Sequence, residues 1–360
     1  MRIGLIIYGN LNNLTGGYIY DRILVDYMQQ HGHQVEIISL PQRNYGRHLL
    51  DSFARRLLAD SANLRIDLLL QDELCHPSLC RINRRLRKKV YFPIVAIVHQ
   101  VLCRQPRSGL FNRLYETVER PYLNSVDAFI FNSNTTRKTV EQLIEGRRPS
   151  IVAFPAGDRL GCLTSSDRIE SRAKAPGPLE LIFVGNLLPN KGLLPLIRGL
   201  SRLPFETWHL TVVGSPEMNR RYFRRVEKFV VAKNMKQQVV FAGLRDGHEL
   251  ASLLDRSHVF IMPYSHEGFG MAHLEAMGFA LPVIGASSGA VKEFVTPEQN
   301  GFLIDHGDVQ TMLAFLQRLN QDRQLLIKLS HAALQTFHKH PKWSDTMKGV
   351  DRFLSDLVNK

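Results

Sequence analysis

The pattern that most constrains this sequence is an alternation of short apolar runs with longer segments of helical periodicity. Residues 3–8 are a short apolar run and residues 35–40 are the next expected strand, and between them side chains recur at helical spacing over residues 19–30. Strands that are buried on both faces are continuously apolar, and parallel strands need a crossover helix between them. The first 40 residues therefore predict a βαβ unit.

The same alternation continues through the first half and restarts near residue 180. Further strands are expected at 67–70, 95–99, 128–132, 181–184, 210–213, 239–242, 259–262 and 282–284. Helices are expected at 191–203, 217–233, 247–255, 269–278 and 343–358. Strand–helix alternation on both sides of a Gly-, Ser- and Pro-containing stretch is typical of two doubly wound α/β domains.

We therefore predict an α/β fold of two Rossmann-like domains that face a central cleft. The expected boundaries are residues 1–157 for the first domain, 158–178 for a linker and 179–342 for the second domain, with the terminal helix 343–360 able to pack back on the first domain. A length of 360 residues fits two domains. Since ligands bind beyond the carboxyl ends of the strands in such sheets, the cleft is the expected active site.

The charge balance indicates an anionic partner. The chain has 46 Lys and Arg against 33 Asp and Glu, a formal net charge of +13. Such a charge attracts nucleic acid, an anionic membrane surface or a phosphorylated substrate. One cluster within residues 81–89 comprises Arg81, Arg84, Arg85, Arg87, Lys88 and Lys89, and a second comprises Arg220, Arg221, Arg224, Arg225 and Lys228. No helix-turn-helix or aromatic RNA-binding pattern accompanies them, which disfavours nucleic acid.

Localisation is expected to be cytoplasmic, with peripheral association at the inner face of a membrane. The longest apolar stretch, 90–102, is interrupted by Pro93 and His99, whereas a spanning helix needs about 20 apolar residues. The N-terminus lacks a signal-peptide cleavage pattern. The four cysteines, Cys75, Cys80, Cys103 and Cys162, have no zinc-ligand spacing and are expected to be reduced thiols.

Residues 263–275, PYSHEGFGMAHLE, contain the most informative motif. An apolar strand ends before Glu267, two glycines follow, and a helix that carries Glu275 begins. Glycines at a helix start let backbone N–H groups approach an anion, and the helix dipole favours negative charge there. The motif therefore predicts a phosphate site with a carboxylate on either side. The alternative is a capped helix with a surface glutamate.

Glu267 and Glu275 stand in the E-x7-E arrangement of the retaining, family 4-type glycosyltransferases of the GT-B fold, and residues 255–304 as a whole resemble the donor-binding region of that family. Other segments resemble the family in the same order along the chain: Gly16-Gly17, residues 32–35, FNSNTT at 131–136, FPAG at 154–157 and FVGNLLPNKG at 183–192.

The resemblance implies a role for each matched residue. Glu267 would contact the donor sugar, the amides of Gly268, Phe269, Gly270 and Met271 would hold the distal phosphate, and Glu275 would hold the ribose. Lys191 would pair with the diphosphate. Asn186 stands where the family often has Arg, so Arg245 is a candidate for the missing cationic contact. His99 would face the donor sugar across the cleft, and Gly16 and Gly17 would allow close backbone approach. The alternatives are an exposed lysine for Lys191 and a satisfied buried histidine for His99.

The sequence contains no D-x-D pair, which metal-dependent nucleotide-sugar transferases usually need, so we expect no metal and no cofactor. It also lacks a Walker loop, G-x-G-x-x-G and H-E-x-x-H. The leading hypothesis is a retaining transferase that moves a sugar from a nucleotide-diphosphate sugar to a glycan or lipid-linked hydroxyl. A non-catalytic nucleotide-binding or assembly protein of the same fold, and a sugar-nucleotide epimerase or phosphorylase, remain alternatives.

Overall fold

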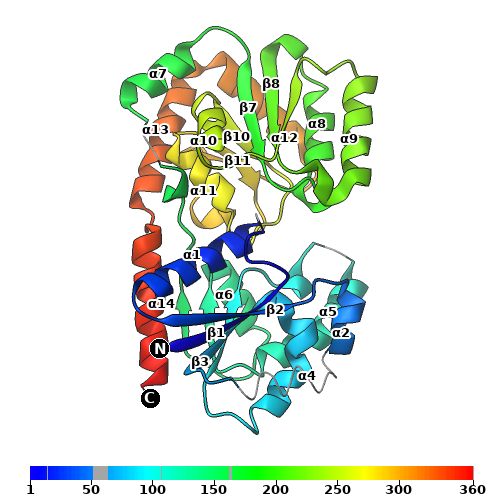
Figure 1. The fold of residues 1–360 in the computed structure, drawn as a ribbon. Coiled ribbons are helices and arrows are strands. Elements are labelled where there is room, and N and C mark those ends of the chain that lie inside the picture. Colours follow the sequence, from blue (N-terminus) through cyan, green and yellow to red (C-terminus); the bar gives the residue numbers. More distant parts are fainter. Residues whose placement is uncertain (14, 52–63, 107, 162–163, 360) are drawn as a thin grey trace. The chain divides into compact units, whose positions relative to one another are not determined.

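The computed structural model describes residues 1–13, 15–51, 64–106, 108–161 and 164–359, so Cys162 lies outside the described residues. The chain forms two compact units. The first comprises Met1–Pro155 and Trp343–Lys360, and the second comprises Ala156–Lys342. Each unit contains a six-stranded parallel sheet flanked by helices (Figure 1). The prediction of two Rossmann-like α/β domains is thereby confirmed.

The sheet of the first unit has the strand order β2-β1-β3-β4-β5-β6. Its strands are β1 (Arg2–Tyr8), β2 (Gln34–Leu40), β3 (Leu68–Asp72), β4 (Ile94–Val98), β5 (Ala128–Phe131) and β6 (Ser150–Val152). Its helices are α1 (Gly16–Gln30), α2 (Tyr45–Asp51), α4 (His76–Leu86), α5 (Gly109–Leu123), α6 (Asn134–Glu141) and α14 (Trp343–Val358), with short 3-10 segments η1 (Glu73–Cys75) and η2 (Leu102–Arg104). The strand order reverses beside β1, which pairs with both β2 and β3.

The reversal places helices on both faces of this sheet. Since parallel crossovers are right-handed, α1 covers one face and the later crossover helices cover the other. Contacts agree with this division, because α1 touches α14, whereas α4 touches α2 and α5. The central strands β3 and β4 are buried along their whole length, as continuous apolar runs predict.

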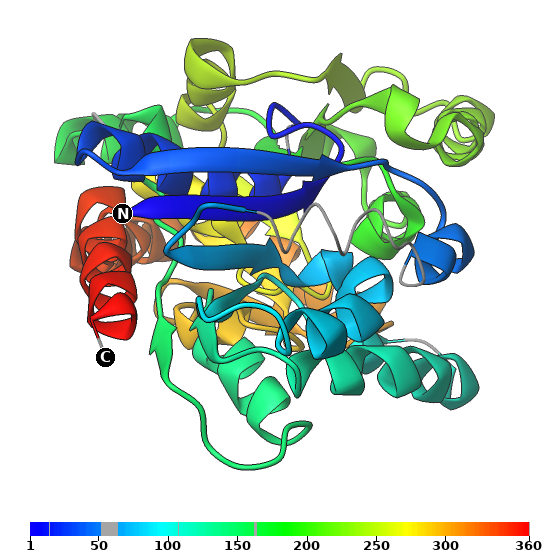
Figure 2. The ribbon, with the colours of Figure 1, turned by 60° about the horizontal axis from the view of Figure 1, so that its bottom comes forward.

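The last helix, α14, belongs to the first unit. The indole of Trp343 meets the ring of Tyr20 edge-on at 5.6 Å, and Thr346 donates a hydrogen bond of 2.9 Å to the carbonyl of Phe154. His33 Nε2 lies 3.0 Å from Asp351 Oδ1. These contacts hold α14 against α1 near the N-terminus of the chain, as both views show (Figures 1 and 2).

The sheet of the second unit has the order β12-β11-β10-β7-β8-β9. Its strands are β7 (Leu179–Val184), β8 (Trp208–Val213), β9 (Val239–Gly243), β10 (Val259–Met262), β11 (Val283–Ala286) and β12 (Gly301–Ile304). Its helices are α7 (Ser166–Lys174), α8 (Leu193–Leu200), α9 (Arg220–Ala232), α10 (Gly247–Asp255), α11 (Met271–Gly278), α12 (Val309–Gln321) and α13 (Arg323–Lys339). Short 3-10 segments are η3 (Asp158–Leu160), η4 (Pro189–Lys191), η5 (Phe205–Thr207), η6 (Pro216–Asn219) and η7 (Val291–Glu293).

The segment 158–178, expected as a linker, contains η3 and α7 instead. Ser165 caps α7 by accepting the N–H of Arg168, and Ile169 and Ala173 are buried four residues apart. The guanidinium of Arg172 donates to the carbonyls of Asp255, Phe279 and Ala280. Two buried positions are too few to produce a visible helical period, which explains why the sequence suggested a linker. The strands β6 and β12 have three and four residues and were not predicted.

Candidate functional site

The candidate site of the second unit lies where its strand order reverses. Strand β7 pairs with β8 on one side and with β10 on the other. Ligands of doubly wound sheets bind at such a reversal, beyond the carboxyl ends of the strands. The loop after β7 carries Lys191, and the loop after β10 carries Glu267. The topology therefore brings together two residues that are 76 positions apart in the chain.

Lys191 and Glu267 form a direct ion pair. Lys191 Nζ lies 2.6 Å from Glu267 Oε1, and the hydroxyl of Ser265 donates to the same oxygen. Burial alone would raise the pKa of Glu267, but the positive charge and hydrogen bond of Lys191, together with His273 and the hydroxyl of Ser265, hold that pKa below its ordinary value. Both sequence-predicted residues are thus charged and in contact.

Gly192 fixes the loop that carries Lys191. Its φ is +73°, and a Cβ there would lie 2.6 Å from Cβ of Tyr264, directly after β10. A side chain is excluded by conformation and by space. This residue also delays the start of the predicted helix 191–203, because α8 begins only at Leu193.

Two glycines fix the loop between β10 and α11. Gly270 has a φ of +100°, and a Cβ there would lie 2.9 Å from Cγ2 of Val291. Helix α11 consequently begins at Met271, two residues later than predicted. Gly289 pairs with Glu267 in a parallel bridge, and its Cβ would lie 2.5 Å from the carbonyl oxygen of Glu267. The backbone from Gly268 to Met271 is therefore held in one conformation at a helix N-terminus, a geometry that suits an anion.

The ring of Phe269 anchors this loop. It packs against Phe294 and His340, with ring centroids 5.3 Å and 5.6 Å apart. Phe269 is buried, whereas Gly268 and Met271 are half-buried. Because the Phe269 side chain is buried and its neighbours Gly268 and Gly270 have no side chains, the loop can contact a ligand only through its backbone at these positions.

Glu275 lies one turn into α11 and is buried. Arg159 Nε, from η3, lies 2.8 Å from Glu275 Oε1. Burial raises the pKa of Glu275, and Arg159 offsets part of that rise. Sequence reasoning missed Arg159 because it lies 116 residues upstream in the expected linker, where nothing in its spacing marks it.

His273, on the same helix, is a second residue that sequence reasoning missed. Its ring is buried 4.8 Å from that of Phe260, and within the described residues neither ring nitrogen has a hydrogen-bond partner. Burial lowers its pKa to about 4, so the imidazole is neutral at ordinary pH.

Asn186 and Arg245, two further predicted donor-binding residues, lie within the described part of the chain but form no hydrogen bond or ion pair with Lys191 or Glu267. Asn186 is half-buried in the loop after β7, and its carbonyl accepts the N–H of Leu188 at 2.8 Å. Arg245 follows the edge strand β9, which β8 separates from β7, so the two strands are about 10 Å apart. Its guanidinium is exposed and lies 3.4 Å from Glu249.

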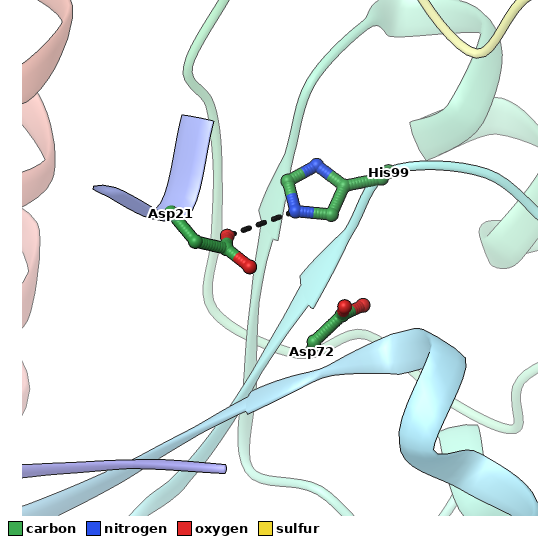
Figure 3. A group of neighbouring side chains, drawn as sticks. All are labelled: Asp21, Asp72 and His99. Carbon is green, nitrogen blue, oxygen red and sulfur yellow. Dashed lines mark hydrogen bonds and ion pairs between the residues drawn. The ribbon is translucent and has the colours of Figure 1, made fainter. Parts of the chain in front are cut away.

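The first unit has a comparable group at its own strand reversal (Figure 3). His99 follows β4, Asp72 ends β3, and Asp21 lies on α1. His99 Nε2 lies 2.9 Å from Asp21 Oδ1. Burial alone would lower the pKa of His99, but Asp21 raises it above its ordinary value. Sequence reasoning predicted His99 and missed both carboxylates.

Gly17 packs directly on His99. A Cβ on Gly17 would lie 3.1 Å from Cδ2 of the imidazole. Gly16 and Gly17 are the first two residues of α1, and Gly16 is exposed. The structure thus brings together two of the predicted residues of the first unit, Gly17 and His99.

The cations of residues 81–89 occupy α4 and its C-terminal end. Arg81, Arg84, Arg85, Lys88 and Lys89 are exposed. Arg87 is exposed as well, pairs with Asp127 and donates to the carbonyl of Ser125 at 2.9 Å. The second cluster, on α9, lines an open groove of about 590 Å³ with Arg220, Arg221, Arg224, Arg225 and Lys228. None of the described helices has the length and apolar character needed to cross a bilayer.

Part of the chain matches a known protein family. Residues 165–336, nearly half of the chain, match the family model described as Glycosyl transferases group 1. An uncharacterized glycosyltransferase of Methanocaldococcus jannaschii, MJ1178, is 26% identical over 176 residues, 49% of this chain and 48% of the relative. The chain spans about half the length of the first curated relatives that it matches.

Two further similarities extend over more of the chain. The Escherichia coli UDP-Gal:alpha-D-GlcNAc-diphosphoundecaprenol alpha-1,3-galactosyltransferase is 26% identical over 323 residues, 79% of this chain and 80% of that protein. The solved structure of sucrose-phosphate synthase from Thermosynechococcus elongatus superposes with a TM-score of 0.82 at 19% identity and covers 99% of both chains. Together, the two-sheet fold and the match of residues 165–336 confirm the resemblance to GT-B glycosyltransferases of group 1.

Proposed function

We propose that the protein transfers a sugar from a nucleotide-diphosphate sugar to a hydroxyl of a glycan or lipid-linked acceptor, with retention of configuration. The observation that carries the proposal is the contact of Lys191 with Glu267 beside the glycine-fixed N-terminus of α11. It combines an ammonium, a carboxylate and oriented backbone N–H groups within one site, a combination that suits a sugar joined to a diphosphate.

Each group has a distinct task in this proposal. Lys191 and the N–H groups at the start of α11 stabilise the negative charge that develops on the departing diphosphate. Glu267 accepts hydrogen bonds from hydroxyls of the donor sugar, and Glu275 accepts them from the ribose. Arg159 holds Glu275 in the buried position that this contact requires, since an unpaired carboxylate would be costly there.

The retaining step needs a base for the acceptor hydroxyl. We infer that an oxygen of the leaving diphosphate takes this proton, because the lowered pKa of Glu267, next to Lys191 and Ser265, makes that carboxylate a weak base. The bond from the anomeric carbon to the β-phosphate oxygen breaks as the acceptor oxygen attacks the same face. The galactosyltransferase of Escherichia coli that the chain resembles is named for an alpha-1,3 product.

A transfer assay tests the function. The purified protein is incubated with UDP-, GDP- and ADP-sugars, first in thermal-shift measurements and then with acceptors that include a diphosphate-linked polyprenyl glycan. A nucleotide sugar at 100 times its dissociation constant should stabilise the fold by about 2.7 kcal/mol. Nuclear magnetic resonance of the product should show an unchanged anomeric configuration. Binding without transfer to any acceptor would favour the non-catalytic alternative, and inversion would contradict the retaining step.

We propose that this chemistry needs no metal ion. Lys191 and the helix terminus supply positive charge where other transferases use a cation. In the described residues, the two groups of three side chains that are close enough to hold an ion, Asp21–Asp72–His99 and Glu73–His76–Glu119, are both in the first unit. Turnover should persist in EDTA. Loss of turnover that only Mg²⁺ or Mn²⁺ restores would contradict the proposal.

We further propose that an anionic membrane surface presents the acceptor. Exposed cations Arg84 and Arg85 lie on α4, which packs against α5, and the exposed Lys88 follows the end of α4. Three large apolar side chains of α5, Leu110, Phe111 and Leu114, are exposed near the start of that helix. Arg87 contacts Ser125 and Asp127 beyond the C-terminal end of α5, so the cations and the apolar side chains lie at different ends of the α4–α5 pair. Each kind of side chain is typical of a surface that rests on lipid headgroups.

Co-sedimentation with vesicles tests the membrane proposal. The wild-type protein should bind vesicles that contain anionic lipid, and the variant with Arg84, Arg85, Lys88 and Lys89 changed to Ser should bind them more weakly. Added salt should weaken the wild-type binding. A matched control changes Arg220, Arg221, Arg224 and Arg225 on α9 to Ser. If only this control variant loses binding, α9 is the contact, and if the wild type ignores anionic vesicles at low salt, the membrane proposal is wrong.

A further inference from the structure

Three ionisable side chains meet at the strand reversal of the first unit, in a buried position. Asp21 comes from α1, Asp72 from the end of β3 and His99 from the residue after β4. All three are buried, and their possible ligand atoms lie within 4.8 Å of one another. Buried charges are costly unless partners neutralise them. Packing of a hydrophobic core does not explain why three ionisable side chains are buried together here.

The carboxylate of Asp21 is only partly satisfied. Asp21 Oδ1 is bonded to His99 Nε2 at 2.9 Å, whereas its buried Oδ2 has no partner among the described residues. Asp72 Oδ1 accepts the N–H of Leu74 at 2.9 Å. Fully ionised, the group would hold two negative charges against at most one positive charge. A proton held by the group lowers this imbalance.

The imidazole of His99 is clamped in one orientation. Its Cδ2 faces Gly17, the ring of Tyr20 meets it edge-on at 5.2 Å, and its carbonyl accepts a hydrogen bond of 2.7 Å from Asn132. Nε2 is committed to Asp21. Nδ1 points away from both carboxylates (Figure 3). One nitrogen is thus held by the protein, and the other is directed away from the acidic pair.

We propose that Asp21 is a positioning residue that holds the Nε2–H of His99, and that Asp72 supports it by keeping the imidazole protonated, so that Nδ1–H donates to a substrate oxygen. The inference rests on the proposed glycosyl transfer, for which the family resemblance implies that His99 contacts the donor sugar. It adds two carboxylates to that contact. Asp21 fixes the orientation of the imidazole, and Asp72 helps to keep it protonated. In His–carboxylate pairs of this kind, the carboxylate fixes the orientation of the imidazole and stabilises its charged form.

Other ionisable groups around His99 do not compete for this proton. Tyr18 and Tyr20 on α1, and Cys75 beside Asp72, have pKa values raised by burial and by the neighbouring acids, so they are neutral near pH 7. Burial lowers the pKa of His76, so it too is neutral. Burial and the charge of Asp21 raise the pKa of Asp72 to about 6. The charge of the group therefore depends on Asp21, Asp72 and His99 alone among these residues.

Histidine titration by nuclear magnetic resonance tests the electrostatic part directly. His99 is assigned with a His99→Gln variant, and its titration midpoint is compared in wild type and Asp21→Asn. The midpoint should lie above 6.5 in wild type and fall by about one pH unit or more in the variant. The matched control is Asp351→Asn, which removes the carboxylate 3.0 Å from His33 Nε2 and should leave His99 unchanged.

A second variant guards against misfolding. Asp72→Asn keeps the hydrogen bond between Asp21 and His99 and should lower the midpoint by a smaller amount. An unchanged midpoint in both folded variants would overturn the proposal. A shift of the His99 signals on adding millimolar Mg²⁺ or Zn²⁺ to wild type would also overturn it, because a cation would then occupy the place assigned to the proton.

Kinetics test the positioning part. In Asp21→Asn, kcat/KM should fall roughly 10- to 100-fold, as expected for loss of a charge-assisted hydrogen bond. Activity should be lost on the alkaline side at a lower pH than in wild type, because His99 deprotonates earlier. A shifted titration with an unchanged rate would overturn the positioning role. If wild type transfers no sugar at all, the proposed function fails, and the titration still decides whether Asp21 and Asp72 hold the proton.

Discussion

The two strand reversals of this protein use carboxylates in different ways. In the second unit each carboxylate is paired with a permanent cation, Glu267 with Lys191 and Glu275 with Arg159. In the first unit Asp21 is paired with a titratable imidazole, and a second carboxylate, Asp72, lies close by. Pairing with lysine or arginine fixes a charge over the whole neutral range, whereas pairing with histidine makes it depend on pH. The same topology therefore supports permanently charged ion pairs in the second unit and a proton-dependent pair in the first.

Both sites depend on glycine, again in different ways. In the second unit Gly192, Gly270 and Gly289 have positive φ angles, so glycine is required by the backbone conformation itself. In the first unit Gly17 starts a regular helix and is required only by the space that His99 occupies. Substitution should therefore distort a loop in one case and displace a single ring in the other.

The largest effect is expected for Lys191→Ala. The change removes the cation that we propose stabilises the leaving diphosphate, and it leaves Glu267 half-buried without its ion pair. Loss of one such electrostatic contact typically costs about 10²–10³ in kcat, and donor binding should weaken by about 1.5–3 kcal/mol. Transfer kinetics and calorimetric titration with the nucleotide measure both.

Glu267→Gln is the partner variant for that comparison. It retains the shape of the side chain and removes its charge. If Lys191 acts on the diphosphate and Glu267 on the sugar, Lys191→Ala should weaken binding of the bare nucleoside diphosphate, and Glu267→Gln should not. Equal affinities of all three proteins for the nucleotide would contradict the assignment of Lys191.

A second prediction concerns the loop fixed by glycine. Gly270→Ala places a Cβ 2.9 Å from Val291 Cγ2 at a φ of +100°. Strain of this kind costs about 1–3 kcal/mol, so the urea midpoint of the second unit should fall and donor binding should weaken. Gly307→Ala is a matched control, because φ there is +86° but nothing lies within 4 Å. The Gly307→Ala variant should be less stable but should bind the donor as wild type does. Equal loss of donor binding in both variants would contradict a specific role of the loop.

The sequence predicted most of the fold because parallel buried strands leave continuous apolar runs. Helices α10 and α14 have the predicted bounds. The misses are short or depend on tertiary contacts. The strand β6 has three residues, and α7 is stabilised by Arg172, whose guanidinium reaches carbonyls more than 80 positions away. Such contacts cannot be inferred from local periodicity.

The candidate site was predictable where it consists of contiguous residues. The motif around Glu267 and Gly270 combines strand, glycines and helix within a few positions, so its backbone geometry follows from local rules. Arg159 and Asp21 could not be found in this way. Arg159 meets Glu275 across 116 positions and Asp21 meets His99 across 78, and both contacts exist only after the sheets have formed.

The third prediction uses pH to separate the two units. Burial raises the pKa of Asp72 to about 6 and those of Glu73 and Glu119 to about 8 in the folded first unit. The folded state then binds more protons than the unfolded chain, so stability should fall as pH rises from about 5 to 8. In the second unit the pKa of His273 is lowered to about 4. The folded second unit is therefore most stable above pH 6.5, and it loses stability as the pH falls below that value, because the unfolded chain binds a proton that the buried imidazole does not.

Hydrogen exchange resolved by segment, and corrected for the intrinsic effect of pH, measures this difference. Between pH 5.5 and 8, amides of β3 and β4 should lose protection relative to amides of β7 and β10, by roughly 1–3 kcal/mol. His76 and Glu275 have shifts that oppose the trend in their own units and reduce its size. Glu73→Gln removes one titrating group and should flatten the slope of the first unit. Parallel changes in both units would contradict the comparison.

The smallest effect is expected for Gly17→Ala, which tests the space around His99. A Cβ at residue 17 would lie 3.1 Å from Cδ2 of the imidazole, a contact that displacement of the ring by a few tenths of an ångström relieves. Alanine is also a better helix former than glycine by roughly 1 kcal/mol, so the stability of the first unit should change little. The ring can move only at the expense of its 2.9 Å hydrogen bond to Asp21, so kcat/KM should fall by about tenfold while the melting temperature stays nearly constant. Gly109→Ala at the start of α5, where nothing lies within 4 Å, is the matched control and should leave both quantities unchanged. An unaltered rate in Gly17→Ala would show that His99 has room to adjust and that its orientation is less tightly fixed than the carboxylate pairs of the second unit.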